Sequence, residues 1–278
     1  FYGSVILEVD APSGGVVDMV YGEMLEDGRL QAYYPFEAKP RAKTDSEGHT
    51  FADRHILRPG RNTVELRLQE RGGRIVELLF RNFGRKLVIR DFGIDNRVYP
   101  LADGGGSFRS GNEYYNRLWQ ISRHTVEHCV GDRFIDCPWR EQAFWINDFV
   151  VSGLYYFMLT ADPKLVRHCL TLAADGFYRY GDMPAVYPAG DPLFFPSMPS
   201  LWLMGVYDYY MYSGDESIRG EMSQAIDDIM GEYDRLGQGD ILVPNHEVWW
   251  NFIDLGYADA KVEIKGHSTL LNALRMTA

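Results

Sequence analysis

The chain has 278 residues, of which 46% are hydrophobic, and this is typical of one large globular domain or two ordinary ones. Its formal net charge of −11 argues against nucleic acid and anionic membranes as main partners, because both are themselves negative. No apolar run reaches the ~18 residues of a membrane span, and three cysteines define no disulfide framework. The first residue is Phe1 rather than a methionine, which suggests an excised or processed segment.

Residues 1–104 are predicted to form a β-sandwich domain, with an N-terminus that is incomplete. Short apolar or alternating runs are separated by turn residues such as Pro12-Ser13-Gly14-Gly15 and Gly72-Gly73. The expected strands cover residues 5–7, 16–21, 64–68, 75–80 and 87–89. Asp103-Gly104-Gly105-Gly106 then indicates a linker.

From Ser107 onward the apolar period becomes helical, and the helices show an internal repeat. Tyr156-Phe157-Met158 precedes Asp162, and Tyr209-Tyr210-Met211 precedes Asp215 at an offset of 53 residues. Asp162 is expected to cap a helix that Pro163 opens. A repeat of this length, with one helical hairpin in each copy, favours stacked hairpins in a solenoid or a closed barrel.

About six helices fit between residues 107 and 278, whereas a closed barrel of paired helices needs about twice that number. Residues 105–278 are therefore predicted to form the first half of such a barrel. Its uncovered inner helix faces would expose the aromatic residues around Trp145 and Tyr156, so self-association or a homo-oligomer is expected.

The densest polar cluster runs from Asp136 through Arg140 and Glu141 to Trp145 and Asp148. If Pro138 opens a helix that continues to about residue 159, Glu141, Trp145 and Asp148 lie on one helical face. Glycoside cleavage needs one carboxylic acid to protonate the leaving oxygen and a second carboxylate as base or nucleophile. A tryptophan beside the acid would exclude water and raise the pKa of that acid.

A purely structural interpretation of the same cluster stays open at this point. Asp136 would then be a helix N-cap, Glu141 an acid of the first helical turn, and Trp145 a core residue. The spacing alone does not exclude this interpretation, because capped amphipathic helices are common.

The sequence Asp-Cys-Pro-x-Arg-Glu at 136–141, with Trp145 and Asp148 after it, resembles the signature of bacterial and fungal α-L-rhamnosidases of glycoside hydrolase family seventy-eight. Tyr21-Gly22-Glu23 before Asp27-Gly28 is similar to a stretch of that family's β-domain. Asn116-Arg117-Leu118-Trp119 resembles the entry to its (α/α)6 barrel. Trp250 to Asp254 is similar to a later element, although Leu255 replaces the usual second tryptophan.

This resemblance implies an inverting α-L-rhamnosidase, with Glu141 as the general acid and no cofactor or metal. Asp136, Arg140 and Asp148 would bind the sugar hydroxyls, and Trp145 would line the pocket. Further substrate-binding residues would be Trp249, Trp250 and Asp254, for which core or capping roles are equally open. The family's base is a glutamate from the later half of the barrel, which would lie beyond Ala278. The isolated chain would therefore be inactive.

Three other functions remain open from the sequence. His124-Thr125-Val126-Glu127-His128 has the H-x-x-E-H pattern of an inverted zinc peptidase. Another toroidal enzyme, such as an α-L-fucosidase or a lyase, would have similar helices. The β-domain is also consistent with a carbohydrate-binding fragment that has no activity.

Overall fold

The computed structural model describes residues 1–30, 51–84, 86–101, 105–238 and 241–242. The chain divides into two compact units. Unit 1 comprises Phe1–Tyr99 and Cys137–Gln142, and unit 2 comprises Pro100–Asp136 and Ala143–Ala278. The assignment of residues 1–104 and 105–278 to a sandwich domain and a half-barrel domain remains a prediction.

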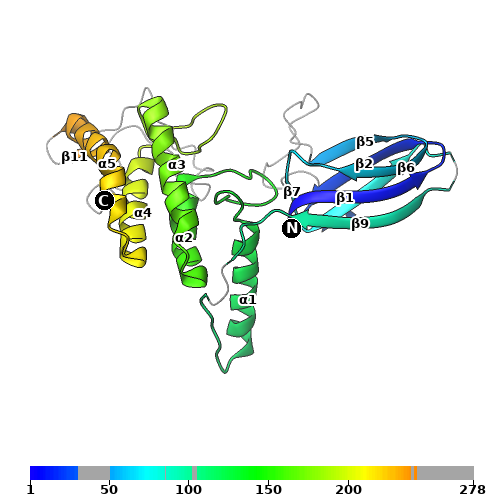
Figure 1. Ribbon diagram of the computed structural model, residues 1–278, viewed down its shortest axis with the longest axis horizontal. Helices are drawn as coiled ribbons and strands as arrows, with labels where there is room; N and C mark the ends of the chain where they lie inside the picture. Colours follow the sequence, from blue (N-terminus) through cyan, green and yellow to red (C-terminus); the bar gives the residue numbers. More distant parts are fainter. Residues whose placement is uncertain (31–50, 85, 102–104, 239–240, 243–278) are drawn as a thin grey trace. The chain divides into compact units, whose positions relative to one another are not determined.

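The described part of unit 1 contains two larger antiparallel sheets (Figure 1) and a small third one in which β3 pairs with β4. In the first, β1 pairs with β6 and β9 along its length and with the short β7 at its start. In the second, β2 lies between β5 and β8. The strands are β1 (Tyr2–Ala11), β2 (Gly15–Gly22), β3 (Leu25–Glu26), β4 (Arg29–Leu30), β5 (Ala52–Leu57), β6 (Gly60–Glu65), β7 (Arg71–Gly72), β8 (Ile75–Arg81) and β9 (Val88–Asn96).

The two sheets share one apolar core, which makes unit 1 a sandwich. Alternate side chains of a strand lie on the same face, and Val5, Leu7 and Val9 of β1 are almost fully buried together with Val17 and Met19 of β2. The predicted strands at 5–7, 16–21 and 75–80 lie within β1, β2 and β8, whereas those at 64–68 and 87–89 share only two residues each with β6 and β9. Strand β5 was not predicted, because the charged residues Asp53 and Arg54 interrupt its apolar alternation.

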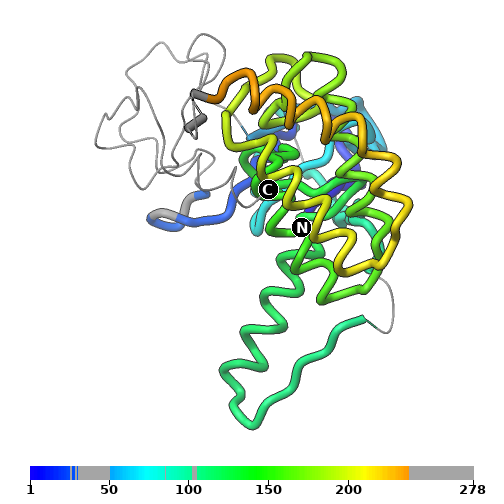
Figure 2. Tube along the Cα trace, turned by 90° about the vertical axis from the view of Figure 1, so that its left-hand side faces the viewer, coloured from blue at the N-terminus to red at the C-terminus, as the bar shows by residue number. Residues whose placement is uncertain are grey.

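Unit 2 contains five helices in its described part. They are followed by two antiparallel strands of two residues each, β10 (Gly237–Gln238) and β11 (Ile241–Leu242). The helices α2 to α5 pack on one another, and α1 projects from them (Figures 1 and 2). Among the described residues, no helix is long and apolar enough to cross a membrane. The bounds are α1 (Glu113–His128), α2 (Ile146–Thr160), α3 (Lys164–Tyr180), α4 (Met198–Ser213) and α5 (Ser217–Leu236).

The predicted repeat has a matching structure at the ends of α2 and α4. Thr160 Oγ1 donates a hydrogen bond of 2.9 Å to the Tyr156 carbonyl. Ser213 Oγ donates one of 2.6 Å to the Tyr209 carbonyl. Both tyrosines are buried. The same hydroxyl contact therefore ends the first helix of each copy.

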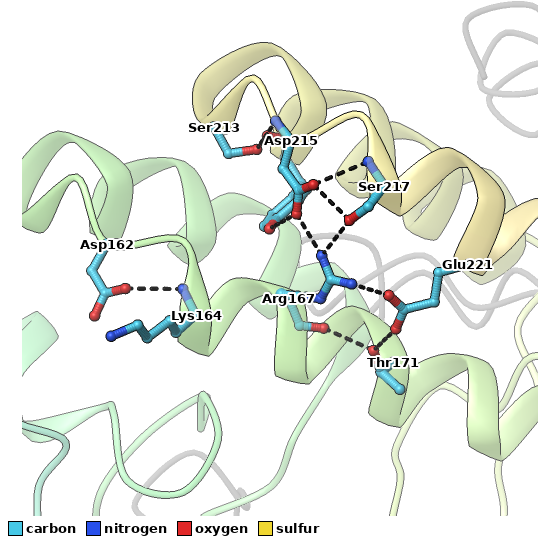
Figure 3. Close-up of polar contacts among 9 residues, drawn as sticks. Asp162, Lys164, Arg167, Thr171, Ser213, Asp215, Ser217 and Glu221 are labelled. Carbon is cyan, nitrogen blue, oxygen red and sulfur yellow. Dashed lines mark hydrogen bonds and ion pairs between the residues drawn. The ribbon is translucent and has the colours of Figure 1, made fainter.

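The aspartates of the repeat begin the next helix of each copy (Figure 3). Asp162 Oδ1 accepts a 3.0 Å hydrogen bond from the Lys164 amide, and Asp215 Oδ1 accepts one of the same length from the Ser217 amide. Each carboxylate thereby satisfies an amide of the first turn that has no partner within the helix. The predicted capping role of Asp162 is confirmed, although α3 starts at Lys164 instead of Pro163, a difference within the usual one or two residues.

Arg167 joins the two copies of the repeat through α3 and α5 (Figure 3). Its Nη1 lies 2.5 Å from Asp215 Oδ2 and 3.1 Å from Ser217 Oγ, and its Nη2 pairs with Glu221. Thr171 Oγ1 donates to the other oxygen of Glu221 at 3.2 Å. The arginine thus fixes the N-terminal turns of α5 against α3.

The predicted helix from Pro138 to about residue 159 was wrong at its start, because α2 begins at Ile146. Trp145 has an extended backbone and forms an isolated β-bridge with Val186. The Ile146 amide donates to the Ala185 carbonyl at 3.0 Å. Since the backbone here bonds to a distant segment rather than to the preceding turn, Glu141 and Trp145 do not share a helical face with Asp148.

The predicted exposure of Tyr156 was also wrong. Its side chain is fully buried, and its ring meets Phe134 edge-on at a centroid distance of 5.4 Å. The exposed side of α2 carries Tyr155 and Met158 instead. Helical spacing explains the difference, because adjacent residues of a helix point about 100° apart.

Candidate functional site

The centre of the sequence motif is a six-residue loop, Cys137–Gln142, that belongs to unit 1 although both flanking segments belong to unit 2. Asp136 and Ala143 close the base of this loop. The Asp136 amide donates to the Ala143 carbonyl at 3.0 Å, and the Ala143 amide donates to Asp136 Oδ1 at 2.9 Å. Asp136 therefore stabilises the two ends of the loop and is not the N-cap of a helix.

Trp139 anchors the loop in unit 1. It is only 7% exposed, and its ring lies 4.8 Å from that of Phe51. Its Nε1 donates a 3.1 Å hydrogen bond to the Tyr21 carbonyl at the end of β2. Gly72 meets the Pro138 carbonyl so closely that no side chain would fit there. These contacts determine where the next two residues, Arg140 and Glu141, lie.

Arg140 and Glu141 line a cavity of about 250 Å³ within unit 1. The two side chains form an ion pair and are 31% and 30% exposed. Solvent and small molecules can thus reach both. The other lining residues combine aromatic surface with hydrogen-bonding groups, and they are Tyr21, Phe51, Gln69, Arg71, Gly72, Trp139 and Gln142.

Arg71 gives one wall of this cavity a fixed positive charge. Its Nε and Nη2 donate to the two oxygens of Asp53 at 2.8 and 2.5 Å, a bidentate arrangement. This hydrogen bonding raises the pKa of Arg71 above its usual value. The guanidinium lies 5.6 Å from the Tyr21 ring centre, and burial raises the pKa of the Tyr21 hydroxyl. Tyr21 therefore remains neutral and Arg71 charged at ordinary pH.

Trp145 and Asp148 belong to unit 2. The Trp145 ring stacks on Phe195 at a centroid distance of 6.0 Å and an interplanar angle of 16°. Asp148 lies in the first turn of α2, where the helix dipole favours a negative charge. Both positions are consistent with packing or capping, and their predicted contacts with a sugar remain predictions. Trp249, Trp250 and Asp254 lie outside the described residues.

Four residues of the site were not predicted from the sequence, namely Trp139, Phe51, Gln69 and Arg71. Trp139 occupies the variable position of the Asp-Cys-Pro-x-Arg-Glu motif, and only its place inside this motif could have pointed to it. The other three belong to unit 1, and no spacing rule relates them to Glu141. Two motifs that were noted separately do meet here, because Tyr21 accepts the hydrogen bond from Trp139.

Solved structures similar to this chain include several rhamnosidases. A GH78 family rhamnosidase of Bacillus sp. GL1 is 24% identical with a TM-score of 0.82, and the match covers 98% of this chain and 27% of that one. A Klebsiella oxytoca rhamnosidase with rhamnose bound is 17% identical with a TM-score of 0.67, over 91% of this chain and 50% of that one.

A Streptomyces avermitilis α-L-rhamnosidase complexed with L-rhamnose is 18% identical with a TM-score of 0.64, over 87% of this chain and 23% of that one. The chain thus spans a quarter to a half of the length of these proteins, and it shares their fold. No curated protein matches the sequence. The predicted fold class, antiparallel β-sheets followed by part of a six-hairpin helical domain, is confirmed.

Residues 103–267, more than half of the chain, match the model of the bacterial α-L-rhamnosidase six-hairpin glycosidase domain. The match begins in the predicted linker and includes the Asp136–Asp148 cluster and all five described helices. The chain belongs to this α-L-rhamnosidase six-hairpin family.

Proposed function

We propose that this chain carries the acid-bearing part of the active site of an inverting α-L-rhamnosidase, with Glu141 as the general acid. The observation that supports the proposal is the position of Glu141 on the wall of a cavity, with a side chain that is 30% exposed and so open to a substrate. The family membership and the rhamnose named for two of the similar structures indicate a rhamnoside as the substrate.

The cavity offers the groups that recognition of a neutral sugar needs. Phe51 and Trp139 close the apolar side of the cavity and pack on each other. Arg140, Arg71 and Gln69 supply hydrogen-bond donors for hydroxyl groups. A sugar that enters the cavity would contact both members of the Arg140–Glu141 pair and would bring the glycosidic oxygen to the carboxyl group.

The chemical role of Glu141 follows from the weakness of an alkoxide as a leaving group. In the oxocarbenium-like transition state, a proton from the Glu141 carboxyl would neutralise the charge that develops on the departing oxygen. An inverting enzyme also needs a base that activates water on the opposite face of the sugar. We assign Asp136, Arg140 and Asp148 to the sugar hydroxyls and Trp145 to the pocket wall, as the family resemblance implies, with Trp249, Trp250 and Asp254 as further contacts.

Substitution of Glu141 by glutamine tests the proposal. The kinetics should be measured in the polypeptide that carries this chain in the cell, whatever its length. Glu141→Gln should lower kcat/KM for a methyl rhamnoside by about 10²–10⁴-fold, because the amide cannot protonate a poor leaving group. The loss for a nitrophenyl rhamnoside should be much smaller, since its leaving group needs little protonation.

Glu216→Gln is the matched control, because Glu216 is an exposed acid at the start of α5 and its side chain caps no amide. This control should leave both rates unchanged. Equal losses on the two substrates in Glu141→Gln would show that Glu141 is not the acid. Faster hydrolysis of an aryl fucoside than of an aryl rhamnoside would contradict the assigned substrate, and binding of rhamnose without turnover would favour a carbohydrate-binding module.

A further inference from the structure

Three side chains with metal-binding chemistry converge in the last two turns of α1. One ligand atom each from His124, Glu127 and His128 can be chosen so that all three lie within 4.8 Å of one another. His124 Nδ1 is 3.8 Å from Glu127 Oε2, and the two imidazole rings lie 4.3 Å apart between centroids. The helix brings them together, because residues three and four apart are neighbours on its surface.

Neighbouring groups orient two of these side chains for metal binding. His128 Nδ1 lies 2.9 Å from the His124 carbonyl oxygen. A carbonyl can only accept a hydrogen bond, so Nδ1 carries the hydrogen and the lone pair is on Nε2. A ring hydrogen donated to a backbone carbonyl is the usual support of a histidine that binds a metal. Arg123 Nε holds Glu127 Oε1 at 3.1 Å, on the opposite oxygen from the one nearest His124.

We propose that His124, Glu127 and His128 form a binding site for one divalent transition-metal ion, for which Zn²⁺ is the best chemical match. Two imidazole nitrogens and one carboxylate oxygen are a common zinc ligand set. Closing the ligands to zinc-bonding distances requires a rotation of His124, whose side chain is 71% exposed and meets little steric resistance. Water would complete the coordination shell.

The site is suited to stabilising the helix and not to peptide hydrolysis. In a zinc peptidase of this motif the glutamate is the base, which would leave two protein ligands at this position. Within the part of the chain that the structure describes, no other histidine, cysteine or acid joins the group. Glu127 is therefore needed as the third ligand.

The position of the group in α1 gives the metal a physical role. The described residues of α1 include none that is buried, so the three side chains are open to solvent and to an ion. An ion held by residues one turn apart binds the helical state in preference to the unfolded one and stabilises it by mass action. This inference does not depend on the proposed rhamnosidase activity.

Calorimetric titration of the metal-free 278-residue chain with Zn²⁺ tests the site, together with metal analysis after dialysis. The wild-type chain should retain one zinc ion. The His124→Ala and His128→Ala chains should each bind zinc at least ~10-fold more weakly than the wild-type chain, because each variant lacks a direct ligand. Zinc should also slow amide hydrogen exchange in α1 of the wild-type chain, and it should fail to do so in these variants.

His168→Ala is the matched control, since His168 is an exposed histidine on α3 outside this group. It should bind zinc as the wild-type chain does. Both test substitutions introduce alanine at partly or fully exposed helical positions and should fold normally, which circular dichroism checks. Two results would overturn the proposal. One is equal zinc affinity in the wild-type and His124→Ala chains. The other is no binding by the wild-type chain at about 100 μM zinc, a concentration that would saturate a site of about micromolar affinity.

Discussion

At the scale of single residues, charged groups stabilise the second sheet of unit 1 by sharing one carboxylate. Asp18 of the central strand β2 accepts from Arg54 Nε and Nη2 at 2.7 and 3.0 Å, and it also pairs with Arg81 of β8. The Asp18 side chain is only 12% exposed. The hydrogen bond from Arg54, which is on β5, holds the pKa of Asp18 below its usual value. Asp18 thus links all three strands of this sheet.

This arrangement predicts how the stability of unit 1 depends on pH. A carboxyl with a lower pKa in the folded state than in the unfolded state stabilises the fold above the unfolded pKa of about 3.9. That stabilisation is lost as the pH falls through the lower folded value. Asp18→Asn should therefore lower the melting temperature at pH 7 and have much less effect near pH 2. A difference between wild type and variant that stays constant over this range would contradict the predicted role.

The acid of the candidate site could be predicted at the residue scale, but its surroundings could not. Glu141 follows from six adjacent residues that resemble a family signature, and a local pattern of this kind is visible in one sequence. The contact between Trp139 and Tyr21 joins residues 118 positions apart. Such a contact depends on how the loop packs on the sandwich, and neither hydrophobic periodicity nor turn chemistry contains that information.

At the scale of secondary-structure elements, helix α3 approaches a neighbouring loop at Gly176. A methyl group on Gly176 would lie 2.9 Å from both Pro184 Cγ and Tyr187 Cγ, which is closer than real contacts allow. Gly176→Ala should therefore lower the melting temperature, because the clash costs about 1–3 kcal/mol and exceeds the gain in helix propensity. Thermal denaturation followed by circular dichroism measures the change.

Gly231 of α5 provides the matched comparison for this prediction. No atom lies within 4 Å of a methyl group added there, and Gly231 is a solvent-exposed residue away from the ends of the helix. Gly231→Ala should stabilise the protein by about 0.5–1 kcal/mol, since alanine has the higher helix propensity. If both substitutions stabilise the chain, α3 is not packed as closely as the structure indicates.

The elements of unit 2 were predictable where the determining contacts are local. The ends of α2 and α4 are alike because a hydroxyl residue, a residue with left-handed backbone and an aspartate follow one another at the same spacing in both copies. The hydrogen bonds common to both copies join residues fewer than five positions apart. The start of α2 was not predictable in this way. Pro138 and the acids after it are typical of a helix N-terminus, but the β-bridge of Trp145 with Val186 and the hydrogen bond from the Ile146 amide to Ala185 hold this segment extended. Tertiary contacts thus override local preference here.

At the scale of the whole molecule, the motif is divided between the two compact units. Arg140 and Glu141 belong to unit 1, and Asp136, Trp145 and Asp148 belong to unit 2. The loop that carries Arg140 and Glu141 therefore gains its position from the sandwich, whereas Asp136 precedes the loop and Trp145 and Asp148 follow it at the start of α2. The residues that we assign to the sugar and to its cleavage are thus distributed over both units.

The last prediction concerns the activity of the 278-residue chain itself, which should show no steady-state hydrolysis of rhamnosides. An inverting site needs its acid and base about 6.5–9.5 Å apart on opposite sides of the sugar. Glu141 is assigned as the acid, and the family resemblance implies a base in the later half of the barrel. The chain spans 27% of the Bacillus enzyme and 50% of the Klebsiella enzyme.

Nitrophenyl rhamnoside is the substrate for this measurement, because it needs the least help from the acid and gives the most sensitive signal. The purified chain should release nitrophenol no faster than a heat-denatured sample of the same chain does. L-rhamnose should still bind weakly to the wild-type chain if the cavity beside Arg140 recognises the sugar, and calorimetry measures this separately from turnover. Steady-state cleavage by the monomeric chain would mean that the base lies within these residues, with Asp136 and Asp148 as the first candidates for substitution.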